Sequence, residues 1–281
     1  MLGIIGGSGL YSIEGLKILE HFSDQSPFGL ASGQPCMGEL KGHKIVFLAR
    51  HASGHKLLPS EINYRANIWA LKKAGVSGIL SISACGSLRE KIAPGSLALA
   101  SQYFDFTKGH RKASFFGDGL VAHISSAEAA CPILSSAVIE AAKQLNFEIH
   151  QKLCYACVEG PRLGTRAESF FLRQIGADIV GMTNVPEAFL ALEAQIPYCT
   201  LGIVTDYDCW LDDPTQHASV DKVMSLYAAN LSRVKNLIEV LSKMSVAFSK
   251  SPSRKSLTGA IMTAEKIISP EKMEILKFLQ S

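Results

Sequence analysis

The chain opens with Met1-Leu-Gly-Ile-Ile-Gly-Gly-Ser-Gly9, an apolar run that leads directly into a turn rich in glycine. The run Leu2–Ile5 predicts a buried strand. Gly6–Gly9 predicts a tight turn at its carboxyl end, because glycine adopts backbone conformations that are closed to other residues. Successive N–H groups in such a turn bind oxyanions, and Ser8 adds a hydroxyl donor. The stretch therefore indicates either an anion site at the end of a strand or a plain strand–turn without a ligand.

Two well-known nucleotide-binding loops do not fit this opening. A dinucleotide fingerprint that begins at Gly7 requires a third glycine at position 12, where Ser12 stands, and no acidic residue closes a second strand at the expected distance. A Walker loop requires Gly-Lys followed by Ser or Thr, which does not follow here. The pattern argues against a nicotinamide dehydrogenase and favours a free anion over a nucleotide tail.

Composition limits the class of protein. A chain of 281 residues holds one large α/β domain or two small ones. Hydrophobic residues make up 47%, enough for a substantial core, and charged residues only 19%, so we expect other subunits to cover part of the surface. The net charge of +3, with no basic run among aromatic residues, argues against a nucleic-acid partner.

Cysteine usage indicates a reducing compartment. The seven cysteines are an odd number scattered along the chain, which fits free thiols better than a disulfide framework. Cys154 and Cys157 form the only close pair. Residues three apart in a strand face opposite sides, so we expect core packing there rather than redox or zinc chemistry. The sequence shows neither a signal peptide nor a membrane-spanning run, and we expect a cytoplasmic protein with no membrane partner.

Hydrophobic runs alternate with helical patterns, which predicts an α/β fold with a central mixed sheet flanked by helices. Residues 103–123 predict a long polar and aromatic loop. Pro186 is expected to open a helix with Glu187 in its first turn, where an acid complements the helix dipole. Core strands are expected at Leu2–Ile5, Lys44–Ala49, Gly78–Ile82, Ser96–Ala100, Leu153–Val158, Asp178–Gly181 and Tyr198–Val204. Further helices are expected from Pro59, from Pro132, over Arg166–Ile175, over about 219–244 and near Pro270–Leu279.

Polar residues follow strand after strand in this pattern. Ligands of open α/β sheets sit beyond the carboxyl ends of the strands, so we expect these residues to meet in one crevice. Polar residues at a single strand end can be explained by a turn or a surface pair. Polar residues at five strand ends are not explained by packing alone. The residues are Ser8, Arg50 with His51, Ser83, Met182 with Thr183, and Asp206 with Asp208.

Individual residue types indicate the chemistry of this crevice. Arg50 offers a fixed fork of donors that matches an oxyanion, and its alternative is a surface pair with His51. Ser83, among small neighbours, lets backbone N–H groups approach a ligand, and its alternative is a strand-to-loop turn. Asp206 and Asp208 indicate carboxylates in a mostly apolar pocket, where desolvation raises the pKa; their alternative is an Asx turn with a solvated acid.

Motifs over residues 2–245 carry a family resemblance. In chain order they are Gly3–Leu10, Arg50-His51, Asn63–Leu71, Ala84–Glu90, Glu159–Arg162, Arg166–Ser169, Gly176–Asp178, Met182-Thr183, Val185–Glu187 and Thr205–Trp210. Together they resemble the trimeric nucleoside phosphorylase family, and within it most closely the branch that acts on S-methyl-5′-thioadenosine. The resemblance implies a single nucleoside phosphorylase domain over 1–245, a homotrimer, and no metal or cofactor besides phosphate as co-substrate. Residues 246–281 are expected to form an extension with a short helix.

The resemblance also implies site residues, position by position. The expected phosphate ligands are Ser8, Arg50, His51, Ser83 and the Ala84 backbone. The expected nucleoside contacts are Met182 and Thr183 at the ribose, Leu163, Asp206 and Asp208 at the base, Val220 and Val223 at the 5′ substituent, and His123 in a neighbouring subunit's site. Two positions depart from the family: Leu163 stands where an aromatic residue usually stacks on the base, and Gly164 replaces a hydroxyl residue.

The reaction that the resemblance implies is phosphorolysis, which yields adenine and 5-methylthioribose 1-phosphate for purine and methionine salvage. Asp206, Asp208 and His51 are the expected catalytic residues, with Asp206 supplying a proton to N7 of the leaving purine. A carboxylate accepts from N6–H of adenine but repels the O6 of 6-oxopurines, so we expect 6-aminopurine nucleosides. The alternative activity is a 6-oxopurine or broad-range purine nucleoside phosphorylase, and the non-enzymatic alternative is a nucleoside-binding sensor, which would be expected to lack Arg50 or Asp206.

Overall fold

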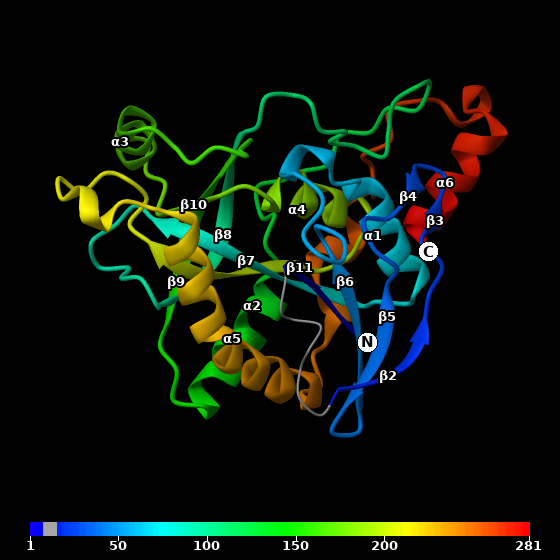
Figure 1. Cartoon of the computed structure of the whole chain (residues 1–281). Coiled ribbons are helices and arrows are strands. Elements are labelled where there is room, and N and C mark those ends of the chain that lie inside the picture. Colours follow the sequence, from blue (N-terminus) through cyan, green and yellow to red (C-terminus); the bar gives the residue numbers. More distant parts are fainter. Residues whose placement is uncertain (8–15) are drawn as a thin grey trace.

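The computed structural model describes residues 1–7 and 16–281, so Ser8 lies outside the described residues. In this part of the chain, nine strands form one mixed sheet in the order β10-β9-β8-β11-β7-β1-β6-β5-β2 (Figure 1). β3 and β4, of two residues each, pair only with each other and form a separate small sheet. The strands are β1 Leu2–Gly6, β2 Leu16–His21, β3 Gln25–Ser26, β4 Gly29–Leu30, β5 Cys36–Leu40, β6 His43–Ala49, β7 Gly78–Ser87, β8 Leu97–Phe106, β9 Ile149–Val158, β10 Ile179–Gly181 and β11 Tyr198–Asp206.

Helices cover both faces of the sheet. In the view of Figure 1, α2 and α5 lie below the sheet and α1 and α4 lie above it. The α-helices of the described residues are α1 Tyr64–Lys73, α2 Pro132–Gln144, α3 Arg166–Gln174, α4 Asn184–Glu193, α5 Val220–Lys243 and α6 Pro270–Gln280. Single 3₁₀ turns occur at Pro59–Glu61, Pro214–Gln216, Phe248–Lys250, Pro252–Lys255 and Glu265–Ile267. The α/β sandwich expected from the sequence is confirmed.

The first strand sits at the centre of this arrangement because both of its faces are apolar. Ile4 packs in one core cluster, with residues of α2 and α5, while its neighbour Ile5 packs in the other, with residues of α1, α4 and α6. Successive side chains of a strand point to opposite faces, so an uninterrupted apolar run is what a strand between two helical layers requires. β1 pairs in parallel with β6 on one side and β7 on the other.

Several strands exceed their predicted bounds, and β7 and β8 run furthest past their predicted ends. β7 continues through Ser83 and Ala84 to Ser87, so these residues lie within a strand and not in a loop after it. β8 continues to Phe106, and the predicted loop over 103–123 therefore starts only after that residue. β8 continues because it forms hydrogen bonds with β9 as far as Phe106, which lies opposite Val158. The sequence did not indicate this, because Gln102–Phe106 is not a continuous apolar run.

The segment after α5 packs onto the main core. Leu257, Ile275, Leu276 and Leu279 are buried in the same cluster as residues of α1 and α4. Phe248 lies against Gly78, where a Cβ would come within 2.3 Å of its ring. The short helix predicted near the end of the chain is present as α6. Among the residues that the structure describes, no helix is long and apolar enough to cross a membrane.

A buried acid fastens the loop after β8 to the end of α4. The carboxylate of Glu193 accepts hydrogen bonds from Ser114 Oγ at 2.7 Å and from the Phe115 backbone N–H at 2.8 Å. Burial raises the pKa of Glu193 to about 7, against the pull of these two donors toward the ionised form. The Glu193 carboxyl, to which the loop after β8 is hydrogen-bonded, therefore ionises near neutral pH.

This pKa predicts a pH-dependent contribution to stability. An unfolded glutamate titrates near about 4.3, so from there to about 7 the folded chain binds more protons than the unfolded chain, and stability falls as the pH rises. Glu193→Gln mimics the protonated carboxyl and should remove this term. We expect the free energy of unfolding of the variant, relative to the unmodified protein, to improve by on the order of 2 kcal/mol between pH 5 and pH 8.

Urea unfolding at several pH values measures this difference. The matched control is Glu128→Gln, the same substitution at an exposed position. A Glu193→Gln difference that stayed constant from pH 5 to 8 would contradict the assignment of this titration to Glu193.

Candidate active site

A cavity of about 660 Å³ opens at the carboxyl ends of β1, β6, β7 and β11. Nearly all the described residues that the sequence predicted for the phosphate and nucleoside site line this cavity. They are Arg50, His51, Ser83, Ala84, Leu163, Met182, Thr183, Asp206, Asp208, Val220 and Val223. A second, shallower cavity of about 960 Å³ near Leu2 and Lys44, at the opposite ends of the strands, contains none of them.

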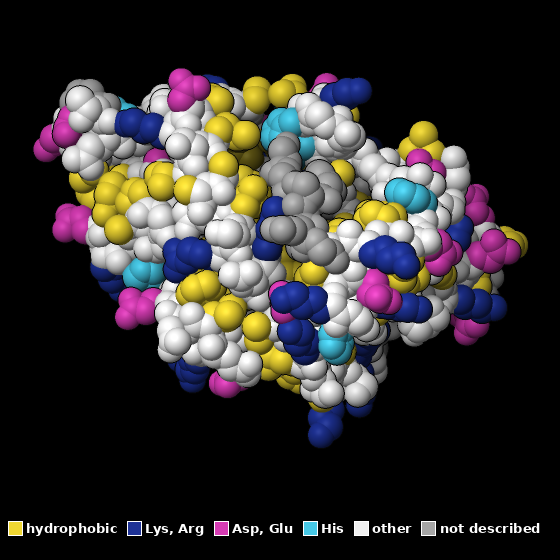
Figure 2. Space-filling view, turned by 60° about the horizontal axis from the view of Figure 1, so that its bottom comes forward, with side chains coloured by type: hydrophobic (Ala, Val, Ile, Leu, Met, Phe, Trp, Pro, Cys, Tyr) yellow, Lys and Arg dark blue, Asp and Glu magenta, His cyan; other side chains and the backbone are white. Residues whose placement is uncertain are grey.

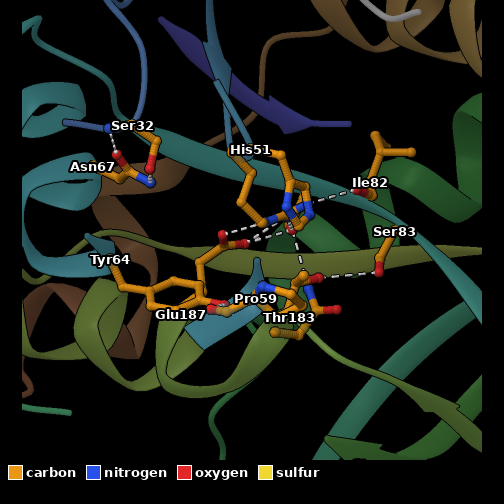
Figure 3. A network of polar contacts seen from close by, with 12 residues as sticks. Ser32, His51, Pro59, Tyr64, Asn67, Ile82, Ser83, Thr183 and Glu187 are labelled. Atoms are coloured by element: carbon orange, nitrogen blue, oxygen red, sulfur yellow. Dashed lines mark hydrogen bonds and ion pairs between the residues drawn. The ribbon is translucent and has the colours of Figure 1, made fainter. Parts of the chain in front are cut away.

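Arg50 directly follows β6 and forms a buried ion pair with Glu187. Figure 3 labels Glu187 and marks the contacts of its carboxylate with dashed lines. Arg50 Nε and Nη2 donate to the two carboxylate oxygens of Glu187 at 2.7 and 2.8 Å, and Nη1 donates to the Ile82 carbonyl at 3.2 Å. Arg50 is 2% exposed and Glu187 0%. Burial alone would lower the pKa of Arg50, but the carboxylate of Glu187 outweighs it and raises the pKa, so the cation persists. The pair orients the guanidinium at the cavity wall.

Glu187 lies in the first turn of α4, as the sequence predicted, but its pairing was not predicted. The side chain is fully buried and bonded to Arg50, Ser81 and Tyr198. Helix α4 also begins irregularly, with Val185 in an extended conformation. The signal that could have indicated the pairing is an acid in a largely apolar helix that contains no lysine or arginine.

His51 lies beside Arg50 with its ring stacked on His55 at 4.2 Å between centroids. The Leu57 carbonyl is 2.8 Å from Nδ1, which assigns the ring proton to Nδ1 and leaves Nε2 as an acceptor. Burial lowers the pKa of His51 to about 4, and the positive charge of Arg50 acts in the same direction. The ring is therefore neutral at physiological pH.

Two hydroxyl groups face each other near the centre of the cavity. Ser83 Oγ lies 3.3 Å from Thr183 Oγ1, and Ser83 also donates to the Ala84 carbonyl at 3.1 Å. Met182, next to Thr183, fits against Gly160, where a Cβ would come within 2.5 Å of its sulfur. A glycine is needed at position 160 both for this close contact and for its positive φ of +67°. These contacts bring Ser83 of β7 together with the turns that follow β9 and β10.

The two aspartates lie at the end of β11. Asp206 accepts hydrogen bonds from Thr205 Oγ1 and from the Asp208 backbone N–H, each at 2.7 Å. Burial raises the pKa of both Asp206 and Asp208 against these donors. Asp208 adopts a positive φ of +51°, which aspartate tolerates better than most residues. The carboxyl groups are thus buried, ordered and easier to protonate than a free aspartate.

Leu163 and the first turns of α5 line the cavity with more exposed apolar surface. Leu163 is 40% exposed and Val220 68%, while Val223 is half-buried beside them. Gly164 leaves open space toward Asp208: a Cβ there would be 3.7 Å from its carboxylate oxygens. A hydroxyl side chain at position 164 would therefore approach Asp208, and this chain lacks that contact.

His123 is the one described site prediction that the structure does not bring to the cavity. It is exposed, and its backbone N–H donates to the Ala260 carbonyl at 2.9 Å, in the strand-like bridge between residues 122 and 261. Its predicted contact with a neighbouring subunit is not tested within a single chain. Ser8 lies outside the described residues.

Arg111 is a buried cation that the sequence reasoning missed. From the loop after β8 it donates to the Glu159 carboxylate at 2.8 Å and to the carbonyls of Met182 and Val185 at 2.8 and 2.6 Å. It thereby links the turn after β9 to the turn after β10, on both of which cavity residues stand. Its partner Glu159 is 48 positions away in the chain. A local sequence pattern cannot predict an ion pair between residues so far apart in the chain.

The described residues hold no group of three or more His, Cys, Asp or Glu side chains that could bind a metal ion. The cavity instead presents cations, amides and hydroxyls toward β1, β6 and β7, and carboxyls toward β11. This arrangement suits a ligand that is anionic at one end and offers both donors and acceptors at the other.

The fold and this site belong to a known family. The family model of the phosphorylase superfamily matches residues 1–242, and the chain belongs to that superfamily. Curated relatives are S-methyl-5′-thioadenosine phosphorylases, among them those of Geobacter sulfurreducens, 41% identical over 99% of this chain and 97% of the relative, and of Rhodospirillum rubrum, 46% identical over 86% and 81%.

Solved structures agree with this assignment. A methylthioadenosine phosphorylase from an Antarctic soil metagenomic library has a TM-score of 0.92 at 41% identity, covering 99% of this chain and 98% of its own. The methylthioadenosine phosphorylase of Schistosoma mansoni in complex with adenine has a TM-score of 0.82 at 35% identity, covering 86% and 90%. The expected nucleoside phosphorylase fold is confirmed.

The Arg50–Glu187 pair predicts a stability effect. Glu187→Gln removes the negative charge and leaves a buried guanidinium without its counter-ion, which costs about 3–5 kcal/mol. The control is Glu168→Gln in the Arg162–Glu168 pair, whose side chains are 58% and 47% exposed. That pair is worth less than about 1 kcal/mol, and glutamine keeps the helix cap. Equal losses for both variants in denaturant unfolding would show that the buried pair does not organise the site.

Proposed function

We propose that this protein catalyses the phosphorolysis of S-methyl-5′-thioadenosine to adenine and 5-methylthioribose 1-phosphate. The observation that carries the proposal is one cavity with a buried Arg50 at one end and buried aspartates at the other. The similarity to curated phosphorylases of this substrate over nearly the whole chain supports it. The alternative of a nucleoside sensor without turnover is not favoured, because Arg50 and Asp206 both lie in the cavity.

The anion end is proposed to hold phosphate below C1′ of the nucleoside. Arg50, Ser83 and the Ala84 backbone would contact the phosphate, with Ser8 as a further donor. His51 would act differently from a cationic ligand, because its neutral ring offers an acceptor at Nε2. That acceptor suits the proton of monohydrogen phosphate. The dianion that these donors hold in place would stabilise the positive charge that develops on the sugar, so the phosphate site would serve catalysis as well as binding.

The base end is proposed to protonate the leaving purine. As a phosphate oxygen forms its bond to C1′, the bond from C1′ to N9 breaks and its electron pair moves to the purine. Asp206, whose pKa is raised by burial, would supply a proton to N7, and Asp208 would help hold the base edge. Leu163 would cover one face of the base, and Met182 with Thr183 would contact the ribose. Val220 and Val223 would surround the methylthio group.

We also propose a homotrimer. Large hydrophobic side chains remain exposed around the cavity mouth and beyond it, including Leu163, Phe170, Phe171, Val220 and Met224. Figure 2 shows such exposed hydrophobic patches on one face of the molecule. Contiguous apolar surface of this kind is typical of interfaces. His123 is proposed to enter the site of a neighbouring subunit, and residues 246–281 are proposed as an extension of the 1–245 domain. The free cysteines fit the proposed cytoplasmic location.

An ultraviolet assay with three nucleosides tests the proposed reaction. We expect adenine release from methylthioadenosine only when phosphate is present, with a higher kcat/KM than for inosine. Adenosine, which shares the base, should rank between them or equal methylthioadenosine. Equal cleavage in phosphate-free buffer would indicate a hydrolase, and a preference for inosine would favour the 6-oxopurine alternative.

Asp206→Asn tests the proposed base contact. An amide donates to the O6 of hypoxanthine but supplies no proton to N7, so we expect adenosine kcat to fall by on the order of 10²-fold, within the range of general acid catalysis. The ratio of kcat/KM for inosine over adenosine should rise. The matched control is Asp212→Asn, at an exposed site outside the cavity. An unchanged ratio with a uniformly lower rate would show that Asp206 does not contact the base.

A further inference from the structure

A hydroxyl group that the proposed mechanism leaves unused lies in the cavity wall. Tyr227 stands on α5 one turn beyond Val223, and its ring packs in the core cluster beneath the sheet. The residue is 6% exposed and contributes to the lining of the cavity. Among the described residues, none accepts a hydrogen bond from its Oη. Leaving a buried hydroxyl without a partner is costly, so a ligand atom is the expected partner.

The surroundings of this hydroxyl define the end of the cavity to which it belongs. Oη lies 3.6 Å from the point that a Cβ at Gly7 would occupy, at the carboxyl end of β1. Burial raises the pKa of Tyr227 to about 12, although the charge of Arg50 and the Gly7 backbone act the other way. The phenol is therefore protonated at neutral pH and is available as a donor.

The strand order separates this hydroxyl from the base. β1 and β11 are both neighbours of β7, so Gly7 and Asp206 stand two strand spacings apart, about 9–10 Å. The Arg50 guanidinium and the Gly7 backbone N–H, which both lower the pKa of Tyr227, are donors and cannot accept its proton. Since no described residue accepts that proton either, we expect the acceptor to come from the ligand.

A phosphate oxygen would accept this hydrogen bond better than the 5′-methylthio group of the nucleoside. The sulfur of a 5′-methylthio group is a weak acceptor, whereas a phosphate oxygen forms a charge-assisted hydrogen bond of about twice the ordinary strength. We propose that Tyr227 Oη–H binds the phosphate co-substrate, and the 1-phosphate of the product, as a donor from the α5 side. This inference rests on the proposed function and adds to it a specificity residue that no sequence motif indicated.

Tyr227→Phe tests the assignment because it removes one oxygen and keeps the ring. We expect KM for phosphate to rise about ten-fold or more, the range for a lost hydrogen bond to a charged group, while KM for methylthioadenosine stays within about two-fold. The control is Tyr207→Phe, whose hydroxyl donates to the Glu90 carbonyl outside the cavity, and it should leave KM for phosphate unchanged.

A binding measurement without turnover accompanies the kinetics. Phosphate should raise the thermal midpoint of the unmodified protein, and Tyr227→Phe should need about ten-fold more phosphate for the same rise. Without phosphate, the variant should be at least as stable as the unmodified protein, because it no longer buries an unpaired hydroxyl. A lower midpoint for the variant without phosphate would instead show a structural hydroxyl and overturn the assignment.

The outcomes separate this inference from the proposed function. If the unmodified protein releases adenine without phosphate, the proposed function fails. If the unmodified protein requires phosphate but Tyr227→Phe keeps its KM for phosphate, only the role of Tyr227 fails. A rise in KM for adenosine alone, with methylthioadenosine and phosphate unaffected, would show that the hydroxyl contacts the 5′-OH of the nucleoside and would also overturn the assignment.

Discussion

The buried ion pair between Arg50 and Glu187 is the interaction on which the architecture of this site depends. It connects the end of β6 to helix α4, and Ser81 of β7 bonds to both partners. A guanidinium and a carboxylate far from solvent are tolerated only when each satisfies the other and neighbouring groups satisfy the rest. Here Tyr198, Ser81 and the Ile82 carbonyl complete that satisfaction. The pair therefore fixes a cation at the cavity wall, and it requires a specific set of partners from distant parts of the chain.

The remaining site geometry is arranged around that cation. Donors gather at the ends of β6, β1 and β7, and acids gather at the end of β11, two strand positions from β1. The two ends thus differ in charge, as the proposed placement of phosphate at one end and purine at the other requires. Arg111 joins the turns after β9 and β10, so the middle of the cavity is braced as well. Electrostatic preorganisation of this kind is the main source of catalysis when no covalent intermediate forms.

The sequence predicted the strands, the layers and most of the cavity lining, because these follow from local patterns. The apolar run Leu2–Ile5 forms the buried strand that it predicted, and Asp206 ends β11 two residues beyond the predicted end of that strand. The same patterns failed where a tertiary contact decided the outcome. Glu187 lies in the first turn of α4, as predicted, but no local pattern indicated its pairing with Arg50, 137 positions earlier. β8 extends to Phe106 because β9 pairs with it, and Arg111 finds Glu159 through folding alone.

A crystal structure of the protein grown with phosphate and adenine tests most directly that the cavity is divided into an anion end and a base end. We expect tetrahedral density within hydrogen-bond distance of Arg50 and of the Ser83–Ala84 segment, and adenine with its N6 and N7 edge at Asp206. Phosphate at saturating concentration bound elsewhere, or adenine lying against Arg50, would contradict the division of the cavity.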